Sequence, residues 1–286
     1  MPKTEQAVWL PLHMEGVLAN TVEDISANIS SALKRDYIPF NVLLGSQKGA
    51  VAIVGSGPSL KKTWKRLKKF KGDIIACNAA CQFLLERGIT PTYMFCFDAD
   101  PLMLEFITPH PDIVYLLASR CPPKAFDLLA GYQIVCWHAA GDERVEALLD
   151  QHGKMEPMIV GGGAAVTRAM IVAIPIGYTE MHIFGGDSSF ADGETHIRKS
   201  TTLERRMPIW CGHRVFETAP WMAKQVEEFK HLTANYCRAG ATFIVHGDGL
   251  LQHVAMLKGM KCDFWPKIRH FCRSFTPNAR ILWQNL

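Results

Sequence analysis

Short apolar runs alternate with amphipathic segments along the chain from residue 50 onward. The runs are continuous, which is typical of parallel strands covered on both faces. They predict strands at 50–54, 73–77, 93–97, 113–117, 133–137, 181–184 and 241–245. Segments with helical spacing lie between them, at 61–70, 79–87, 123–129, 142–151, 164–174 and 219–238. This order predicts a Rossmann-like α/β fold, with a doubly wound, mostly parallel sheet and helices on both faces.

The two ends of the chain differ from this central pattern. Residues 22–33 carry apolar side chains at helical spacing, and Thr21 is a suitable N-cap for a helix there. The segment 187–217 is polar and has no clear period, so we expect no regular element in it. We expect three parts: an N-terminal helical arm (1–48), a nucleotide-binding catalytic domain (49–260) and a C-terminal tail packing on the body (261–286).

The composition narrows the class of partner. The chain has 286 residues, 48% hydrophobic and 20% charged, which is enough for a substantial core. Its net charge of +4 is too weak to indicate nucleic acid, and an anionic small molecule suits it equally well. We therefore expect a nucleotide and a small-molecule acceptor as partners and no nucleic acid, with oligomer formation left open.

Cysteine usage and the apolar stretches bear on the compartment. The nine cysteines include no Cys-x-x-Cys pair, which argues against a disulfide framework or a zinc site. Reduced thiols, and an N-terminus without a signal-peptide pattern, predict a cytoplasmic protein. The longest apolar stretch, 164–176, contains Arg168 and Pro175 and is too short for a bilayer, so we expect no membrane span.

A glycine loop follows the first predicted strand of the sheet, in the order Gly55, Ser56, Gly57, Pro58, Ser59. Glycine allows close approach to a phosphate, proline suits a first helical turn, and a helix N-terminus favours an anion. The loop lacks the Lys-Ser/Thr of a Walker A motif and the third glycine of the dinucleotide fingerprint. It predicts a nucleotide phosphate site at the backbone amides; the alternative is a tight turn without a ligand.

Polar residues end the next two predicted strands. Asp98 and Asp100 follow the strand 93–97, and two carboxylates there suit Mg²⁺ bound together with phosphate oxygens. The alternative is a turn in which Asp100 caps the next helix. Asn78 follows the strand 73–77, where it either caps a helix or hydrogen-bonds a base or ribose.

Two later segments add candidate residues. Gly162 and Gly163 precede an alanine-rich helix and serve either a second phosphate contact or close packing on the sheet. Asp187 follows the strand 181–184 and is a candidate for binding metal or orienting a substrate hydroxyl. His196, further on, is a candidate general base or phosphate contact; the alternative is a solvated loop histidine.

Taken together, these segments resemble the MptE-like 6-hydroxymethylpterin diphosphokinase family, which also includes the catalytic region of bacterial flagellar motility accessory factors. The resemblance covers about residues 50–246. It rests on VAIVGSGPSL, IIACNAA, MFCFDADP, GGGAAVTRAMIVAIPIGYTEMHIFGGDSSFADGETH and AGATFIVHG. The family usually has Gly-Gln-Asp-Leu where this chain has Gly185-Gly186-Asp187-Ser188.

The resemblance implies transfer of diphosphate from ATP to the hydroxymethyl group of a pterin, with Mg²⁺ as the metal. By the same resemblance Gly55, Ser56 and Gly57 hold nucleotide phosphates, while Asp98 and Asp187 bind the metal or position the acceptor. Such chemistry depends mainly on positioning and on neutralising charge.

A second resemblance points to a different donor. The glycine loop with CNAA, and the later segment GY…IFGGDSSF, are similar to a bacterial sialyltransferase family that uses CMP-sialic acid. That similarity implies that Ser56 and Asn78 contact CMP and that His196 acts as a base. The sequence thus leaves open a diphosphokinase, a glycosyltransferase and a nucleotide-binding protein without catalysis.

Overall fold

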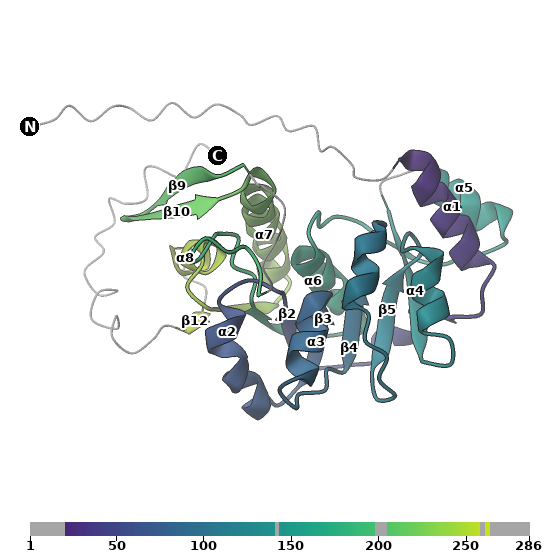
Figure 1. Ribbon diagram of the computed structural model, residues 1–286, viewed down its shortest axis with the longest axis horizontal. Helices are drawn as coiled ribbons and strands as arrows, with labels where there is room; N and C mark the ends of the chain where they lie inside the picture. Colours follow the sequence, from purple (N-terminus) through teal and green to yellow (C-terminus); the bar gives the residue numbers. More distant parts are fainter. Residues whose placement is uncertain (1–20, 141–142, 198–204, 258–260, 264–286) are drawn as a thin grey trace, which may run out of the picture.

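The computed structural model describes residues 21–140, 143–197, 205–257 and 261–263 (Figure 1). Most of the predicted N-terminal arm from Thr21 onward is therefore described, whereas residues 1–20 and the tail from residue 264 lie outside the described residues. No helix among the described residues is both long and apolar enough to cross a membrane.

The strands of the structure are β1 (Ile38–Pro39), β2 (Ala50–Val54), β3 (Asp73–Cys77), β4 (Tyr93–Cys96), β5 (Val114–Ala118), β6 (Ile134–Ala139), β7 (Met158–Ile159), β8 (Glu180–Phe184), β9 (Met207–Cys211), β10 (Arg214–Thr218), β11 (Thr242–His246) and β12 (Lys261–Asp263). The α-helices are α1 (Val22–Leu33), α2 (Leu60–Thr63), α3 (Ala79–Leu85), α4 (Pro123–Leu128), α5 (Glu143–Gln151), α6 (Ala165–Ile176), α7 (Pro220–Arg238) and α8 (Leu250–Leu257). Three 3₁₀ segments complete the described chain: η1 (Phe40–Leu43), η2 (Trp64–Lys69) and η3 (Pro101–Phe106).

The main sheet is parallel and doubly wound, as the sequence predicted. Its strand order is β1-β6-β5-β4-β3-β2-β8-β11-β12, with β7 paired to β6. Strands β3 to β6 lie on one side of β2 in this sheet, while β8, β11 and β12 lie on the other side. The boundary between β2 and β8 is therefore a topological switch point, where sheets of this kind open a crevice beyond their carboxyl ends.

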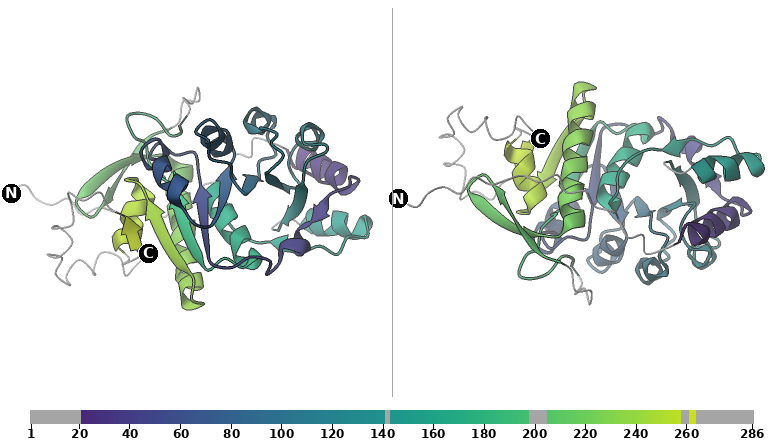
Figure 2. Two further views of the ribbon diagram at one scale, coloured as in Figure 1. Left: turned by 90° about the horizontal axis from the view of Figure 1, so that it is seen from below. Right: turned by 90° about the horizontal axis from the view of Figure 1, so that it is seen from above.

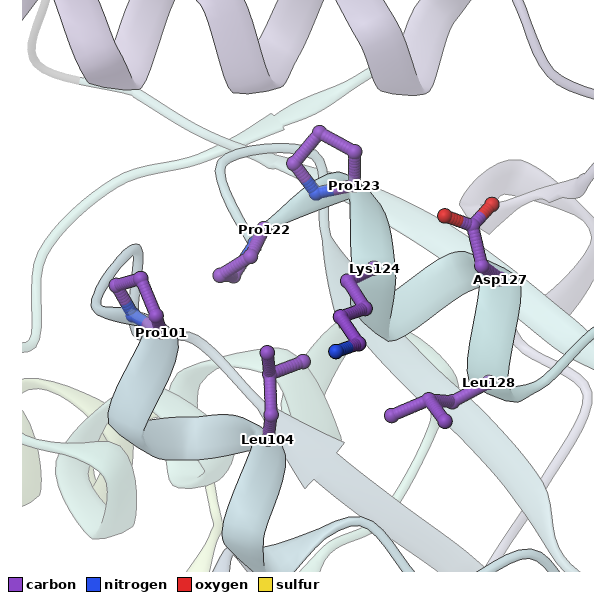
Figure 3. Close-up of a pocket in the computed structure, with 7 residues that line it drawn as sticks. All are labelled: Pro101, Leu104, Pro122, Pro123, Lys124, Asp127 and Leu128. Atoms are coloured by element: carbon purple, nitrogen blue, oxygen red, sulfur yellow. The ribbon is translucent and has the colours of Figure 1, made fainter.

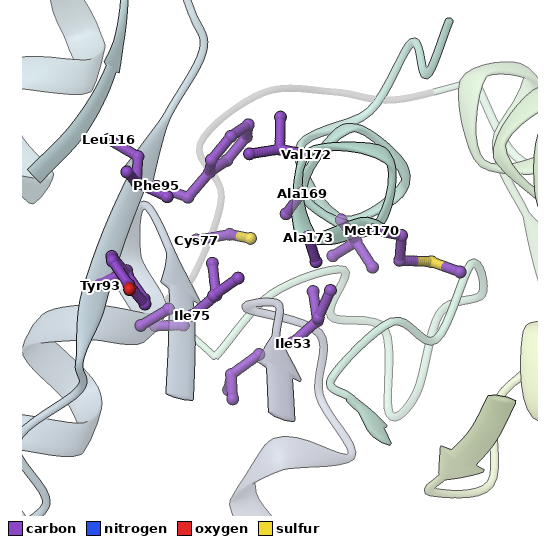
Figure 4. Packing of buried hydrophobic residues seen from close by; sticks show 14 of the residues in the cluster. Ile53, Ile75, Cys77, Tyr93, Phe95, Leu116, Ala169, Met170, Val172 and Ala173 are labelled. Atoms are coloured by element: carbon purple, nitrogen blue, oxygen red, sulfur yellow. The ribbon is translucent and has the colours of Figure 1, made fainter. Parts of the chain in front are cut away.

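Helices cover both faces of this sheet (Figure 2). The segments that connect β2 to β6 lie on one face, and α6 and α7 lie on the other. Figure 4 shows α6 packed on the sheet, with Ala169, Val172 and Ala173 directed toward Phe95 and Ile75. All five of these side chains are fully buried, so the core runs between α6 and the strands β2–β5.

The N-terminal helix forms as its sequence predicted. The Thr21 hydroxyl accepts from the N–H of Asp24, and the Asp24 carboxylate accepts from the N–H of Thr21, which together form a capping box. The apolar stripe of α1 is buried at Ile25, Ile29 and Leu33, where the helix packs on α5 and α4.

The structure differs from the sequence prediction at two places that matter for the site. The predicted helix 61–70 is a four-residue α2 followed by the 3₁₀ segment η2. The predicted irregular segment 187–217 contains the antiparallel hairpin β9–β10, which turns at Gly212. Its strands bury side chains at only a few positions, so the apolar alternation in the sequence is weak.

Candidate functional site

A cavity of about 270 Å³ opens at the carboxyl ends of β2, β3, β4 and β8, beside the switch point. Its lining comes from the loops after these strands and from the N-terminal ends of α6 and α7. Its lining residues are Gly55, Ser56, Gly57, Cys77, Asn78, Asp98, Gly163, Ala164, Ala165, Val166, Gly185, Gly186, Asp187, Ser188, Thr195, His196, Trp221, Met222 and Gln225. The fold thus brings most of the candidate residues predicted from the sequence to one place.

The glycine loop borders this cavity, but its amides are engaged within the protein. The N–H of Gly55 donates to the carbonyl of Phe184 and that of Gly57 to the carbonyl of Gly185, both at 2.8 Å. The N–H of Ser59 donates to Oδ2 of Asp187, also at 2.8 Å. The expectation that these three amides grip a ligand phosphate is therefore not met, because the loop packs directly against the turn after β8.

Ser56 is the exception in the loop. Its N–H and hydroxyl form no hydrogen bond within the described residues, and its carbonyl accepts from the N–H of Ile197 at 2.7 Å. Pro58 has no N–H and, like Ser59, does not line the cavity. A ligand in the cavity therefore meets the loop at Ser56 and at the bare backbone of its two glycines.

The anion at the start of α2 is the Asp187 carboxylate. Asp187 is buried, and this burial raises the pKa of its carboxyl from 3.8 to about 6, although hydrogen bonds from Ser59 lower it. A Cβ at Gly57 would collide with Oδ2 of Asp187, so the glycine is required for this contact. The loop thus holds an acidic side chain of the protein where the sequence predicted a phosphate.

Asn78 and Asp98 lie side by side beyond β3 and β4. The side-chain amide of Asn78 donates from Nδ2 to Oδ2 of Asp98 at 3.1 Å and makes no cap hydrogen bond to α3. This contact orients Oδ1 of Asn78 as a buried acceptor without a partner among the described residues. Asn78 also has a backbone φ of +47°, a value that residues other than glycine rarely adopt. A strained residue with an unused acceptor, lining a cavity, is a candidate for contact with a ligand.

Asp98 presents its carboxylate to the cavity. The surrounding protein removes enough water to raise the pKa of this carboxyl, while the hydrogen bond from Asn78 and the charge of Arg120 lower it. Asp98 is thus a second acidic group in the cavity wall besides Asp187.

Two of the predicted site residues serve local structure instead. Asp100 does not line the cavity, because its carboxylate accepts from the N–H of Leu102 at 2.8 Å and caps η3. Gly162 has a φ of +78° and lies so close to the backbone of Arg168 that a Cβ would collide with it. These positions fit the alternatives weighed for them, a cap and close helix packing.

Gly163 does line the cavity, yet its N–H is also engaged. It donates to Oε2 of Glu228 at 2.7 Å, and the hydroxyl of Thr167 donates to the same oxygen at 3.1 Å. A carboxylate of α7 therefore occupies the N-terminal end of α6, as Asp187 occupies that of α2.

His196 lines the cavity next to Ile197, whose N–H donates to the carbonyl of Ser56 in the glycine loop. Its Nδ1 is 2.8 Å from the hydroxyl of Thr195, and its ring is nearly parallel to that of Trp221. Trp221, Met222 and Gln225 were not predicted from the sequence. They belong to the first turns of α7, whose regular amphipathic pattern indicated a helix but not which end of it meets the site.

Two carboxylates face the cavity, and no lysine or arginine belongs to its described lining. Among the described residues no three acidic, histidine or cysteine side chains converge as a ready metal cluster. Mg²⁺ does not need one, since it commonly takes one or two carboxylates and completes its shell with water and substrate phosphates. Asp98 and Asp187 each line the cavity and are the candidates for that role, whereas Asp100 does not line it.

A larger hollow of about 670 Å³ lies elsewhere, between η3 and α4 (Figure 3). It is lined by Pro101, Leu104, Pro122, Pro123, Lys124, Asp127 and Leu128. This open, mostly apolar surface carries neither paired carboxylates nor a glycine turn. The smaller cavity at the switch point is therefore the candidate functional site.

Solved structures with a similar fold include the MAf glycosyltransferase from Magnetospirillum magneticum AMB-1. The two chains share 20% identity with a TM-score of 0.60 over 79% of this chain, which spans only 36% of that protein. The sialyltransferase CstII from Campylobacter jejuni, solved with cytidine-5'-monophosphate, is 12% identical over 68% of this chain and 79% of that one, and its TM-score of 0.28 supports no conclusion.

No curated protein matches the chain. The family described as 6-hydroxymethylpterin diphosphokinase MptE-like matches residues 23–193. This match covers more than half of the chain and includes the glycine loop, Asn78, Asp98 and Asp187. The protein therefore belongs to the MptE-like family.

Proposed function

We propose that this protein is a Mg²⁺- and ATP-dependent transferase that moves diphosphate to the hydroxymethyl group of a pterin-like heterocycle. Membership of the MptE-like family supports the class of reaction. The observation that carries the proposal is the pair of carboxylates, Asp98 and Asp187, in a cavity wall without lysine or arginine in its described lining.

The charge of the cavity favours a cation between protein and nucleotide. Phosphate groups brought directly against Asp98 and Asp187 would be repelled at short range. Asp98 and Asp187 would be the residues to hold a Mg²⁺, which would supply charge neutralisation for the phosphates of the nucleotide. The raised pKa of Asp187 supports this arrangement, because burial disfavours its charged form more than Ser59 and Lys62 stabilise it, so a bound cation would favour the carboxylate further.

The transfer itself requires one bond to form and one to break. The acceptor's hydroxymethyl oxygen attacks the β-phosphorus of ATP, the bond from that phosphorus to the oxygen bridging the α-phosphate breaks, and AMP leaves. The hydroxyl proton passes to a base in the cavity, for which His196 is the candidate in this chain. Asp98, held by Asn78, is oriented to bind metal or the acceptor.

The unpartnered Oδ1 of Asn78 suits the nucleotide base. It accepts a hydrogen bond from an exocyclic amino group, which both adenine and cytosine carry. This feature supports a second candidate function, a glycosyltransferase with a CMP-activated sugar, in which His196 would act as the base toward the acceptor hydroxyl.

The direct test is to incubate the protein with ATP, Mg²⁺ and 6-hydroxymethyl-dihydropterin and to measure AMP. We expect AMP only when all three are present, and none in EDTA. Parallel thermal-shift titrations with ATP, CMP and a CMP-sugar separate the candidates, since a ligand at a hundredfold excess over Kd stabilises by about 2.7 kcal/mol. If no AMP forms, and CMP stabilises the protein while ATP does not, the diphosphate transferase is ruled out in favour of the glycosyltransferase. If a nucleotide stabilises the protein but no donor is turned over, the protein binds nucleotides without catalysing a transfer.

A further inference from the structure

Trp221 occupies an unusual position for a large aromatic residue. It lies in the first turn of α7, directly after Pro220, and forms part of the cavity wall with 41% of its surface exposed. In contrast, Trp137 is completely buried and stacks on Phe95 and Phe97 in the core. The core therefore explains Trp137, whereas the indole of Trp221 offers a large apolar surface to whatever enters the cavity.

The ring of Trp221 lies beside that of His196. The two rings are inclined by only 13°, with centroids 6.1 Å apart in a stacked arrangement. His196 is in turn held by the hydroxyl of Thr195, which is itself buried. The exposed part of the indole suits a planar aromatic ligand better than a sugar, because stacking requires a flat π-surface on both partners.

Another residue of the lining supplies a partner for the edge of a heteroaromatic ring. Asp98 brings a carboxylate to the same cavity, so a ring N–H or amino group has an acceptor there, while Oδ1 of Asn78 is left for the nucleotide base. The proposed function places the reacting phosphates in this cavity as well. A ring stacked on Trp221 therefore shares one cavity of about 270 Å³ with the groups that react.

We propose that Trp221 is the stacking surface for the planar ring of the acceptor and thereby selects a heteroaromatic acceptor. This inference rests on the proposed function for the identity of that acceptor. Trp221 is a binding residue in this scheme, and His196 lies stacked beside it.

The test measures binding and does not depend on turnover. The intrinsic fluorescence of 6-hydroxymethylpterin is titrated with wild-type protein and with Trp221→Ala, Trp221→Phe and Trp210→Ala. Trp210 is the matched control, since it is 68% exposed on β9 and does not line the cavity. We expect Trp221→Ala to weaken pterin binding by about tenfold or more. Trp221→Phe, which keeps a ring, should retain most of the affinity, and Trp210→Ala should bind as wild type does.

ATP and CMP are titrated against the same proteins to distinguish an acceptor ring from a nucleobase. Unchanged ATP and CMP affinity in Trp221→Ala, with lost pterin affinity, supports the proposal. Equal pterin affinity in wild type and in Trp221→Ala overturns it, as does a loss confined to ATP or CMP, which would assign the surface to the base. If the wild-type protein binds ATP but no pterin, both this inference and the proposed pterin acceptor are wrong. If it binds pterin but forms no AMP, only the proposed reaction is wrong.

Discussion

The buried carboxylate of Asp187 accepts a hydrogen bond from the backbone N–H of Ser59, 2.8 Å away and 128 residues earlier in the chain. The start of α2 is where a Rossmann-like glycine loop commonly meets a ligand phosphate. Here the protein places one of its own acidic side chains there and exposes the loop to the cavity at Ser56. The same contact binds the loop after β2 to the turn after β8, across the switch point of the sheet.

Asp187 is expected to make stability depend on pH. Its carboxyl has a pKa of about 6 in the folded protein against an ordinary 3.8, so the folded state binds the proton more tightly. The resulting stability is fully present below about pH 4 and is lost as pH rises through about 6, by about 3 kcal/mol at most. Asp187→Asn keeps an acceptor for Ser59 without the charge, so it should lack this decline and be more stable than wild type at pH 7.

Urea unfolding at pH 4 and pH 7 in metal-free buffer measures this difference. We also expect Asp187→Asn to lose transferase activity, a common cost of removing a destabilising functional charge. An unchanged decline of stability between the two pH values in the variant would show that other groups cause it.

Asp98 and Asp100 form a matched pair of carboxylates for testing the metal. Asp98 lines the cavity, while Asp100 caps η3, a task that asparagine performs about equally well. Asp98→Asn should lower Mg²⁺-dependent AMP formation by about a hundredfold or more, and Asp100→Asn should leave it nearly unchanged. Thermal unfolding of both variants checks that neither is grossly destabilised. Equal activity in the two variants would remove Asp98 from the site.

Gly57 is expected to tolerate no side chain. A Cβ there would meet Oδ2 of Asp187 and lie 2.6 Å from the carbonyl oxygen of Gly185. Gly57→Ala should therefore push the glycine loop and the turn after β8 apart, destabilising the protein by about 1–3 kcal/mol. Chemical denaturation measures this. A variant as stable as wild type would mean that the two turns can separate at no cost.

Glu228 and Glu227 are neighbours on α7 with different roles. Glu228 accepts from the N–H of Gly163 and the hydroxyl of Thr167, and so caps α6, whereas Glu227 pairs with Lys230 on its own helix. Glu228→Ala should lower the free energy of unfolding by about 1–2 kcal/mol, the usual value of a helix cap. Glu227→Ala should change it by less than about 1 kcal/mol. Equal losses in the two variants would contradict the assignment of the cap.

A chain of four side chains on β8, β11 and η2 fixes the tautomers of two histidines. Arg66 can only donate, so Nδ1 of His246, 3.2 Å away, must accept. Nε2 of His246 then carries the proton and donates to Nδ1 of His182 at 3.0 Å, and Nε2 of His182 donates to Glu180 at 2.7 Å. ¹⁵N NMR of the protein with both imidazoles neutral should show His182 and His246 protonated at Nε2. A proton at Nδ1 of His246 would contradict this arrangement.

Much of the fold could be predicted from the local pattern of apolar and polar residues in the sequence. Continuous apolar runs, their spacing and the turn glycines predicted β2, β3 and β8 and the helices between them, because burial on both faces of a parallel sheet leaves its mark on every such strand. The cap of α1 was equally readable, since Thr21 and Asp24 are three residues apart. The hairpin β9–β10 was missed because its outer faces are exposed at Trp210 and Val215, which disrupts the apolar alternation.

By itself, the sequence determined which residues end the strands, and thus that Asn78, Asp98 and Asp187 would gather at one edge of the sheet. Only the tertiary structure decided what each of them does there. Asp187 accepts from the N–H of Ser59 in the glycine loop, Glu228 accepts from the N–H of Gly163 before α6, and Trp221 joins the cavity lining from a helix distant in the chain. Local pattern records burial and turn geometry, but a hydrogen bond between residues more than sixty positions apart depends on how the strands are ordered, which no short segment encodes.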